Sequence, residues 1–218
     1  TSWGAMGVKA FDYDLDGRPD LLITDMHSDM LRDVAPAEEK LKSSIPFPNA
    51  FFEEDGRSTY GNSLFHNRGE GRFEEVSDRM GVENYWPWGL SVGDLNADGW
   101  EDVLVTASMS FPYRYGINSV FLNDGGRRFV DAEFVVGVEP RRDRRTHVEW
   151  IVLDCDTAAD REHPLCAGKS GKLSIHGTTG TRSSAVFDFD ADGDLDIVTG
   201  EFGDLPQVLV SDLAQRHT

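Results

Sequence analysis

Short apolar runs alternate with strongly polar turns along this chain of 218 residues. Apolar runs around 8–11, 90–92 and 185–187 each lead into an acidic turn, and the sequences LLIT, VLVT and DIVT follow those turns. The runs hold about four or five residues and are rich in β-branched side chains, which favours strands over helices. The pattern therefore predicts three hairpins, each closed by an acidic turn.

A second repeated pattern lies between the acidic turns. NSLFHNRGEGRF at 62–73 matches NSVFLNDGGRRF at 118–129, with a glycine-containing turn in the middle of each. We interpret each copy as a further hairpin. The paired apolar residues of its two strands are Leu64 and Phe65 with Phe73, and Val120 and Phe121 with Phe129. About four short antiparallel strands in each repeat indicate an all-β fold built from blades of a β-propeller.

Three repeat units divide the chain. We expect them at 1–75, 76–131 and 132–218, and the third carries an insertion at 132–182. Together with a segment at 26–61, this insertion forms the long loops between repeats. Long loops on a rigid scaffold are common binding surfaces, so we expect recognition to reside there.

The acidic turns share the pattern D-x-[DN]-x-D-G-x-x-D, and glycine stands at the sixth position of each. Calcium takes six to eight oxygen ligands, and alternating acidic residues in a tight turn supply them from one side of the chain. The expected ligands are the side chains at positions 1, 3, 5 and 9 and the main-chain carbonyl at position 7. They are Asp12, Asp14, Asp16, Arg18 and Asp20; Asp94, Asn96, Asp98, Trp100 and Asp102; and Asp188, Asp190, Asp192, Asp194 and Asp196. We therefore expect about three bound calcium ions.

The acidic turns allow two other interpretations. A single copy could be an acidic turn without metal, but three copies at the same spacing make that interpretation weak. An EF-hand would place a glutamate at position 12 on an exiting helix, whereas position 12 is Ile23, Val105 and Thr199 within predicted strands. The prediction is therefore structural calcium rather than a helix-lever calcium sensor.

The charge balance agrees with bound cations. Asp and Glu number 39 against 21 Lys and Arg, which gives a formal net charge of −18. Nucleic acids and anionic membrane surfaces would be repelled, so neither is an expected partner. Since apolar runs of membrane-spanning length are missing from the sequence, membrane insertion is not expected either.

Cys155 and Cys166 lie in a segment rich in Pro, Gly and charged residues, which predicts an irregular loop. A local disulfide is the favoured interpretation, and free thiols or a metal site with His163 are the alternatives. A disulfide requires an oxidising compartment, so we expect a secreted, periplasmic or cell-surface protein. The chain starts at Thr1 inside a repeat, so we also expect a piece of a longer protein with any signal peptide upstream.

Other conspicuous residues favour plain structural roles. Trp86 and Trp88 could stack on a sugar, but packing at the start of a blade is favoured. The basic run at 141–145 could meet an acidic partner or pair with carboxylates of this chain, and a solvated loop is the default expectation. His147 and His176 belong to no ligand spacing, so no role is assigned to the histidines.

At MGVKAFDYDLDGRPDLLITD, NSLFHNRGEGRFEEVSDRMGV and SSAVFDFDADGDLDIVTGEF the sequence resembles the FG-GAP/VCBS repeat proteins, the integrin-α-type β-propellers. Within them it is most similar to the bacterial ASPIC/UnbV group, related to the cartilage acidic proteins. The resemblance implies calcium in each acidic hairpin and closure with seven blades. Only three clear units are present, so missing blades or another chain would complete the propeller, and the C-terminal ASPIC domain of the group is absent.

The function expected from these features is an extracytoplasmic interaction module, as in cell adhesion, that binds a protein or a glycan. No G-x-S-x-G, H-E-x-x-H or complete P-loop motif is present, and Gly168-Lys169-Ser170 lacks the first P-loop glycine. We therefore do not expect an enzyme. The alternatives are a carbohydrate-active lyase or hydrolase on a propeller scaffold, and a structural subunit of a larger extracytoplasmic complex.

Overall fold

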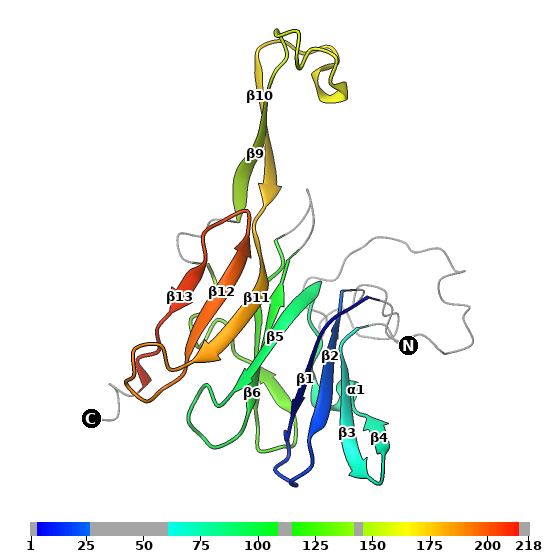
Figure 1. The fold of residues 1–218 in the computed structure, drawn as a ribbon, viewed down its shortest axis with the longest axis vertical. Coiled ribbons are helices and arrows are strands. Elements are labelled where there is room, and N and C mark those ends of the chain that lie inside the picture. The colour runs from blue at the N-terminus through cyan, green and yellow to red at the C-terminus, as the bar shows by residue number, and fades with distance from the viewer. Residues whose placement is uncertain (1–3, 27–60, 109–114, 142–145, 214–218) are drawn as a thin grey trace, which may run out of the picture.

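The computed structural model describes residues 4–26, 61–108, 115–141 and 146–213, and these residues form antiparallel sheets with almost no helix. The all-β prediction is confirmed. Figure 1 shows three sheets side by side and a hairpin that projects from them. The strands are β1 Ala5–Phe11, β2 Asp20–Asp25, β3 Ser63–Gly69, β4 Arg72–Glu75, β5 Pro87–Gly93, β6 Asp102–Ala107, β7 Ser119–Asn123, β8 Phe129–Asp131, β9 His147–Asp154, β10 Lys172–Thr178, β11 Gly180–Phe187, β12 Asp196–Phe202 and β13 Gln207–Leu209; the helices are α1 Ser77–Met80 and a 3-10 turn at Pro164–Cys166.

Each sheet is a simple meander in which consecutive strands pair. The first sheet has the order β1-β2-β3-β4, the second β5-β6-β7-β8, and the third β11-β12-β13 within the described residues. The first two strands of each sheet are joined by an acidic turn. The last pairs before the turns are Phe11 with Asp20, Gly93 with Asp102, and Phe187 with Asp196, so all three turns sit in the same register.

The first strands of the three sheets lie next to one another, with β5 between β1 and β11 (Figure 1). Small residues permit this approach. A Cβ atom at Gly89 of β5 would lie only 3.0 Å from the carbonyl oxygen of Arg182 on β11. Side-chain hydroxyls also cross between sheets: Thr24 Oγ1 donates to the Trp88 carbonyl (2.7 Å) and Ser91 Oγ to the Ser184 carbonyl (3.0 Å). The three sheets therefore share one continuous seam.

Two apolar cores lie between the sheets. Leu22, Leu64 and Phe121 are fully buried in a cluster shared by the first and second sheets, whereas Leu104 packs with Ile197 between the second and third. Strand β6 contributes to both cores and is buried along its whole length. A strand in the middle of a stack is covered on both faces, which explains the uninterrupted apolar run 103–105 at its centre.

The insertion at 132–182 contains structure that the sequence analysis did not predict. Strands β9 and β10 pair as a two-stranded antiparallel hairpin, here called the arm (147–178). The cysteine-bearing loop is irregular as expected, but it is the tip of this hairpin. In Figure 1 the arm extends away from the sheets at the end opposite the acidic turns. Burial alternates along much of β9, and Val148 and Trp150 are among its more buried positions.

A stack of aromatic and cationic side chains joins the second sheet, the third sheet and the base of the arm. The Arg182 guanidinium lies 3.6 Å from the Trp88 ring centroid and 4.4 Å from that of Phe202. Phe202 in turn meets Trp150 of the arm edge to face at 5.2 Å. Trp88 also donates from Nε1 to the Ser108 carbonyl at 2.6 Å. Trp88 therefore packs where a sheet begins, as predicted.

Arg141 differs from the default expectation of a solvated loop. Its side chain is 3% exposed and forms an ion pair with Glu201, whose side chain is fully buried. Arg141 Nε also donates to the Tyr115 hydroxyl at 2.8 Å. The prediction of a solvated residue is therefore wrong for Arg141. The alternative, pairing with a carboxylate of this chain, is what the structure shows. The rest of the basic run, 142–145, and most of the long segment 26–61 lie outside the described residues.

Candidate metal centres

The first aspartate of each acidic turn accepts hydrogen bonds from the main chain of its own turn. Asp12 accepts from the N–H groups of Asp16 (3.0 Å) and Gly17 (2.7 Å). In the other two turns, Asp94 accepts from Asp98 and Gly99, and Asp188 accepts from Gly193. The position-7 N–H also donates to the position-5 carboxylate in every copy, at 2.9 Å, 2.9 Å and 3.2 Å. The turns therefore have one shared internal geometry.

Two positions in each turn adopt the left-handed backbone conformation. Position 6 does so at Gly17, Gly99 and Gly193, with φ of 85°, 90° and 99°. Position 4 does so as well, although it carries a side chain in every copy: Leu15, Ala97 and Ala191 have φ of 57°, 57° and 63°. Sequence reasoning recognised the glycines and missed position 4, because leucine and alanine give no sign of this conformation.

The ninth aspartate ties each turn to the third strand of its sheet. Asp20, Asp102 and Asp196 are at most 1% exposed. One oxygen of each accepts the N–H of position 2, from Tyr13, Leu95 and Phe189 respectively. The other oxygen accepts an N–H from the third-strand side, from Asn67, Asn123 and Ser211, at 2.7–2.8 Å. The sequence predicted these aspartates as ligands only and missed this structural role.

Burial raises the pKa of two of these ninth carboxylates, Asp102 and Asp20. It raises the pKa of Asp102 to about 6, although the two main-chain hydrogen bonds act in the opposite direction. The nearby Asp98 and Asp94 raise this pKa further through charge repulsion. Burial likewise raises the pKa of Asp20 above its ordinary value. A cation in the turn would relieve the repulsion between the carboxylates.

Carboxylate oxygens converge in the first and third turns. Those of Asp12, Asp14 and Asp16 lie within 4.8 Å of one another, and the same holds for Asp188, Asp190 and Asp196. In the second turn the amide of Asn96 interleaves with Asp98, donating to its carboxylate at 2.9 Å and accepting its N–H at 3.0 Å. Three of the four predicted side-chain ligands therefore converge in the first turn and in the third, and the ligand set of the second turn stays a prediction.

The donor set fits calcium. Every converging side-chain atom of the motif is an oxygen, which is the ligand type that Ca²⁺ prefers. Asp14 Oδ1 is buried and accepts no hydrogen bond within the described residues, a costly arrangement unless a cation faces it. The residues at position 7 lie inside the turns, and their carbonyl oxygens stay predicted ligands.

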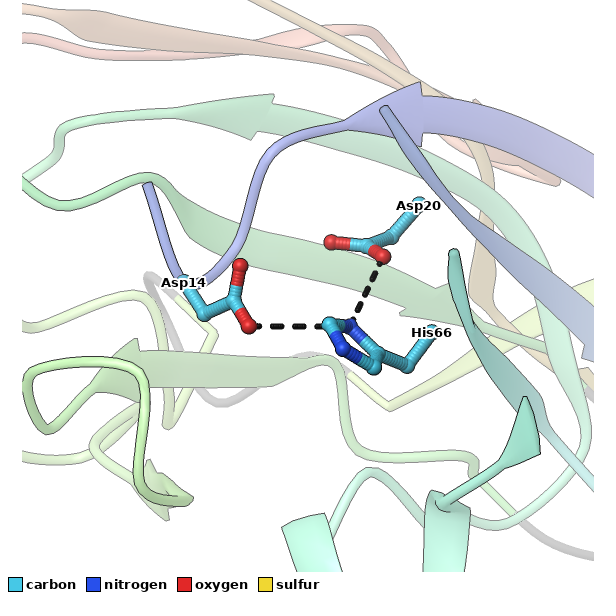
Figure 2. Close-up of side chains that lie close together, drawn as sticks. All are labelled: Asp14, Asp20 and His66. Carbon is cyan, nitrogen blue, oxygen red and sulfur yellow. Dashed lines mark hydrogen bonds and ion pairs between the residues drawn. The ribbon is translucent and has the colours of Figure 1, made fainter. Parts of the chain in front are cut away.

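One histidine also lies beside the carboxylates of the first acidic turn, and the sequence analysis assigned it no role. His66 of β3 lies beside Asp14 and Asp20, as Figure 2 shows, and these three form a further metal-competent group. The sequence contains only a small sign that this histidine differs from its counterpart in the next repeat. Within the repeated N-S-x-F-x-N pattern, the fifth residue is His66 in the first copy and Leu122 in the second.

The predicted disulfide between Cys155 and Cys166 is confirmed, and it closes the tip of the arm. Both sulfurs are thereby consumed, so the alternatives of free thiols and of metal ligation with His163 are wrong. His163 instead accepts the N–H of Leu165 at 3.2 Å within the tip.

Comparison with known families finds two overlapping matches. Residues 52–105 match an FG-GAP-like repeat and residues 86–126 match an FG-GAP repeat. Both matches support the identification of an FG-GAP repeat protein, and no curated protein matches the chain. FG-GAP repeats are common in extracellular interaction modules, and together with the disulfide they indicate an extracellular or periplasmic protein. Among the described residues, no helix is both long and apolar enough to cross a membrane.

Proposed function

We propose that this protein is a calcium-stabilised, extracytoplasmic interaction module whose sheets are blades of a β-propeller. The observation that carries the proposal is the repetition of one turn geometry in three sheets, with a buried ninth aspartate each time and converging carboxylate oxygens in the first and third turns. The same hydrogen bonds recur at positions separated by long stretches of sequence. Such repetition is expected of a shared cation-binding device rather than of isolated acidic turns.

The residues of each turn define what calcium would do there. Bound calcium would supply positive charge where several carboxylates face one another. Asp94 and Asp98 belong to the turn, whereas Asp102 begins β6 and is tied to the N–H of Asn123 near the end of β7. Holding these carboxylates together would therefore fasten the turn to three strands of one sheet. This arrangement favours a structural role over a signalling or catalytic one.

The arm is the best described candidate for a recognition surface. It projects from the sheets (Figure 1), and Ile151, Val152 and Leu165 are 44–48% exposed on it. Its disulfide fixes the tip, which lowers the entropy lost when a partner binds. A stapled hairpin with exposed apolar side chains on a rigid scaffold is typical of a binding element. The partner class proposed is a protein or a glycan.

Closure into a seven-bladed propeller and membership of the ASPIC/UnbV group are parts of the same proposal. They rest on the resemblance of the three repeats, and further blades or another chain would complete the ring. A structural subunit of a larger extracytoplasmic complex would use the same arm for assembly. A polysaccharide lyase or hydrolase is the remaining rival, although the sequence carries no G-x-S-x-G, H-E-x-x-H or complete P-loop motif.

Two measurements test the proposal. Calcium counting by mass spectrometry, with thermal unfolding in calcium and in EDTA, should give about three ions and a lower melting temperature in EDTA. An arm-shortened variant, in which 155–171 is replaced by a two-residue turn, should keep that melting behaviour and lose binding in a glycan array or a screen of extracellular proteins. An unchanged melting temperature in EDTA combined with calcium-dependent cleavage of a polysaccharide would favour the enzyme instead.

A further inference from the structure

The first acidic turn differs from the other two because a buried histidine faces it. His66 is 3% exposed, and its Nδ1 lies 3.1 Å from Asp20 Oδ1 and 3.5 Å from Asp14 Oδ2. Figure 2 shows the ring between the two carboxylates, with dashed lines to each. Asp14 comes from the turn, Asp20 from the start of β2 and His66 from β3. Three separate backbone segments therefore position this group.

The equivalent positions in the other sheets are apolar. The N–H groups of Asn67, Asn123 and Ser211 make the same hydrogen bond to the ninth aspartate of their own sheet. The residues immediately before them are therefore equivalent. They are His66 in the first sheet, Leu122 in the second and Val210 in the third. Leu122 is partly buried and Val210 is 53% exposed, so the sheets form with an apolar residue here and the fold does not require a buried histidine.

The geometry of the group fits a small divalent ion. The three ligand atoms lie within 4.8 Å of one another. Two ligands held about 2.0–2.1 Å from a tetrahedral zinc ion stand roughly 3.3 Å apart. The two nitrogen–oxygen separations of 3.1 Å and 3.5 Å bracket that value. Asp14 Oδ1, which is buried and accepts no hydrogen bond among the described residues, offers a further oxygen toward a cation.

The mixed ligand set changes which ion is preferred. Calcium binds through oxygen, whereas a neutral imidazole nitrogen beside carboxylates suits zinc and other first-row divalent ions. A turn that binds calcium through oxygen alone does not need a histidine nitrogen, and an imidazole buried between two carboxylates can serve as a ligand. The nitrogen is thus the feature that separates the first turn from its two copies.

We propose that Asp14, Asp20 and His66 form a zinc-class transition-metal site, whereas the second and third turns are oxygen-only calcium sites. The inference rests on the proposed function in one respect, namely that the first turn holds a cation. It goes further in assigning a different ion to that turn, so that two of the three expected ions would be calcium, and a ligand outside the nine-residue motif. The chain would then carry two kinds of metal centre in otherwise equivalent sheets.

The test uses the whole chain, stripped of metal and returned to saturating calcium. Zinc is titrated by calorimetry, and cobalt is titrated as a spectroscopic probe because its visible bands report nitrogen ligation and coordination number. The wild type should bind one zinc ion in the presence of calcium. His66→Leu introduces the leucine that stands at the equivalent position of the second sheet. It should weaken zinc binding by about 10–100-fold or more and remove the nitrogen-dependent cobalt bands. Calcium binding by the second and third turns should not change.

Two matched variants keep the test decisive. His176→Leu alters an exposed histidine of the arm and should leave the zinc affinity unchanged, which separates the proposed site from adventitious binding by surface imidazoles. Val210→His places a histidine beside Asp190 and Asp196 in the third sheet and should create a second zinc site, even where His66→Leu folds poorly. Equal zinc affinity in the wild type and His66→Leu would overturn the inference and leave His66 as a hydrogen-bond partner of the carboxylates. Zinc binding at His66 without calcium binding elsewhere would instead overturn the proposed calcium function alone.

Discussion

The three sheets and the arm are stabilised in different ways. In the sheets, two apolar clusters and a set of buried carboxylates connect strands that are far apart in sequence. In the arm, two strands pair only with each other, and its small apolar cluster consists of Leu153, Cys155 and Cys166 with partly buried Leu173 and Ile175. A two-stranded hairpin is marginally stable in water without additional constraints. The sheets therefore depend on buried noncovalent contacts, whereas the arm depends on its covalent bond.

The largest expected effect comes from breaking a buried carboxylate tie in the sheets. Asp102→Ala, measured in EDTA so that metal does not contribute, leaves the N–H groups of Leu95 and Asn123 without their acceptor. Each buried unpaired donor costs about 1–3 kcal/mol, so we expect a loss of about 3–5 kcal/mol in urea unfolding. The arm control is Asp160→Ala, which removes a half-buried acceptor of the Asp154 N–H. If Asp102→Ala lowered the free energy of unfolding no more than Asp160→Ala does, the sheets would not depend on buried carboxylates more than the arm does.

The next effect is confined to the arm. Replacing both Cys155 and Cys166 with serine removes the crosslink, which the chain-entropy model values at about 3 kcal/mol for a loop of this size. We expect hydrogen exchange to accelerate at β9 and β10, while amides of β6 keep their protection and the main melting transition moves by less than about 2 °C. Equal acceleration in β6 would mean that the arm and the sheets unfold together.

A smaller effect concerns pH and the charges buried between the second and third sheets. Burial raises the pKa of Glu139, whose Oε1 accepts from the Tyr115 hydroxyl (2.8 Å) and the Asn118 N–H (3.1 Å). Between the ordinary value of 4.5 and the higher folded value, the folded chain keeps a proton that the unfolded chain releases. The contribution of Glu139 to stability therefore falls as pH rises through that interval.

Glu139→Gln removes this titration, so the stability of the variant relative to the wild type should rise with pH across that window. Chemical unfolding at a series of pH values measures the difference. Glu149→Gln on β9 of the arm is the control, because Glu149 is exposed to water in the folded chain. A relative stability of Glu139→Gln that is flat or falls with pH would show that Glu139 is ionised at little cost in the folded protein.

The sheet and arm regions also differ in how far they could be predicted from sequence. The strands around each acidic turn were predicted because alternation, β-branched residues and turn glycines are local signals. The disulfide was predicted because its cysteines lie eleven positions apart within one polar segment. The arm hairpin was missed because the alternation of HVEW and KLSIH is short and lies on either side of a segment that is rich in charged and turn-forming residues.

The missed site features depend on contacts between distant residues. His66 meets Asp20 across 46 positions, and its neighbours in sequence give no hint of a carboxylate partner. Arg141 reaches Glu201 on another sheet, so its burial follows from the packing of whole sheets rather than from the basic run around it. The ninth aspartate was recognised as acidic, but its tie to the third strand requires the register of that strand. Long-range register is what the sequence pattern did not contain.

The smallest expected effect distinguishes the strained turns of the sheets from the arm tip. Ala97 has φ of 57°, a conformation that costs an L-residue about 1–2 kcal/mol, whereas glycine adopts it freely. Glycine also loses more entropy on folding, so Ala97→Gly should stabilise the protein by about 0.5–1 kcal/mol in urea unfolding. Ala158 of the arm tip does not have a positive φ, so Ala158→Gly should instead accelerate local hydrogen exchange at the tip. If Ala97→Gly destabilised the protein as an ordinary Ala-to-Gly change does, the left-handed position 4 would not be a strained feature of the acidic turns.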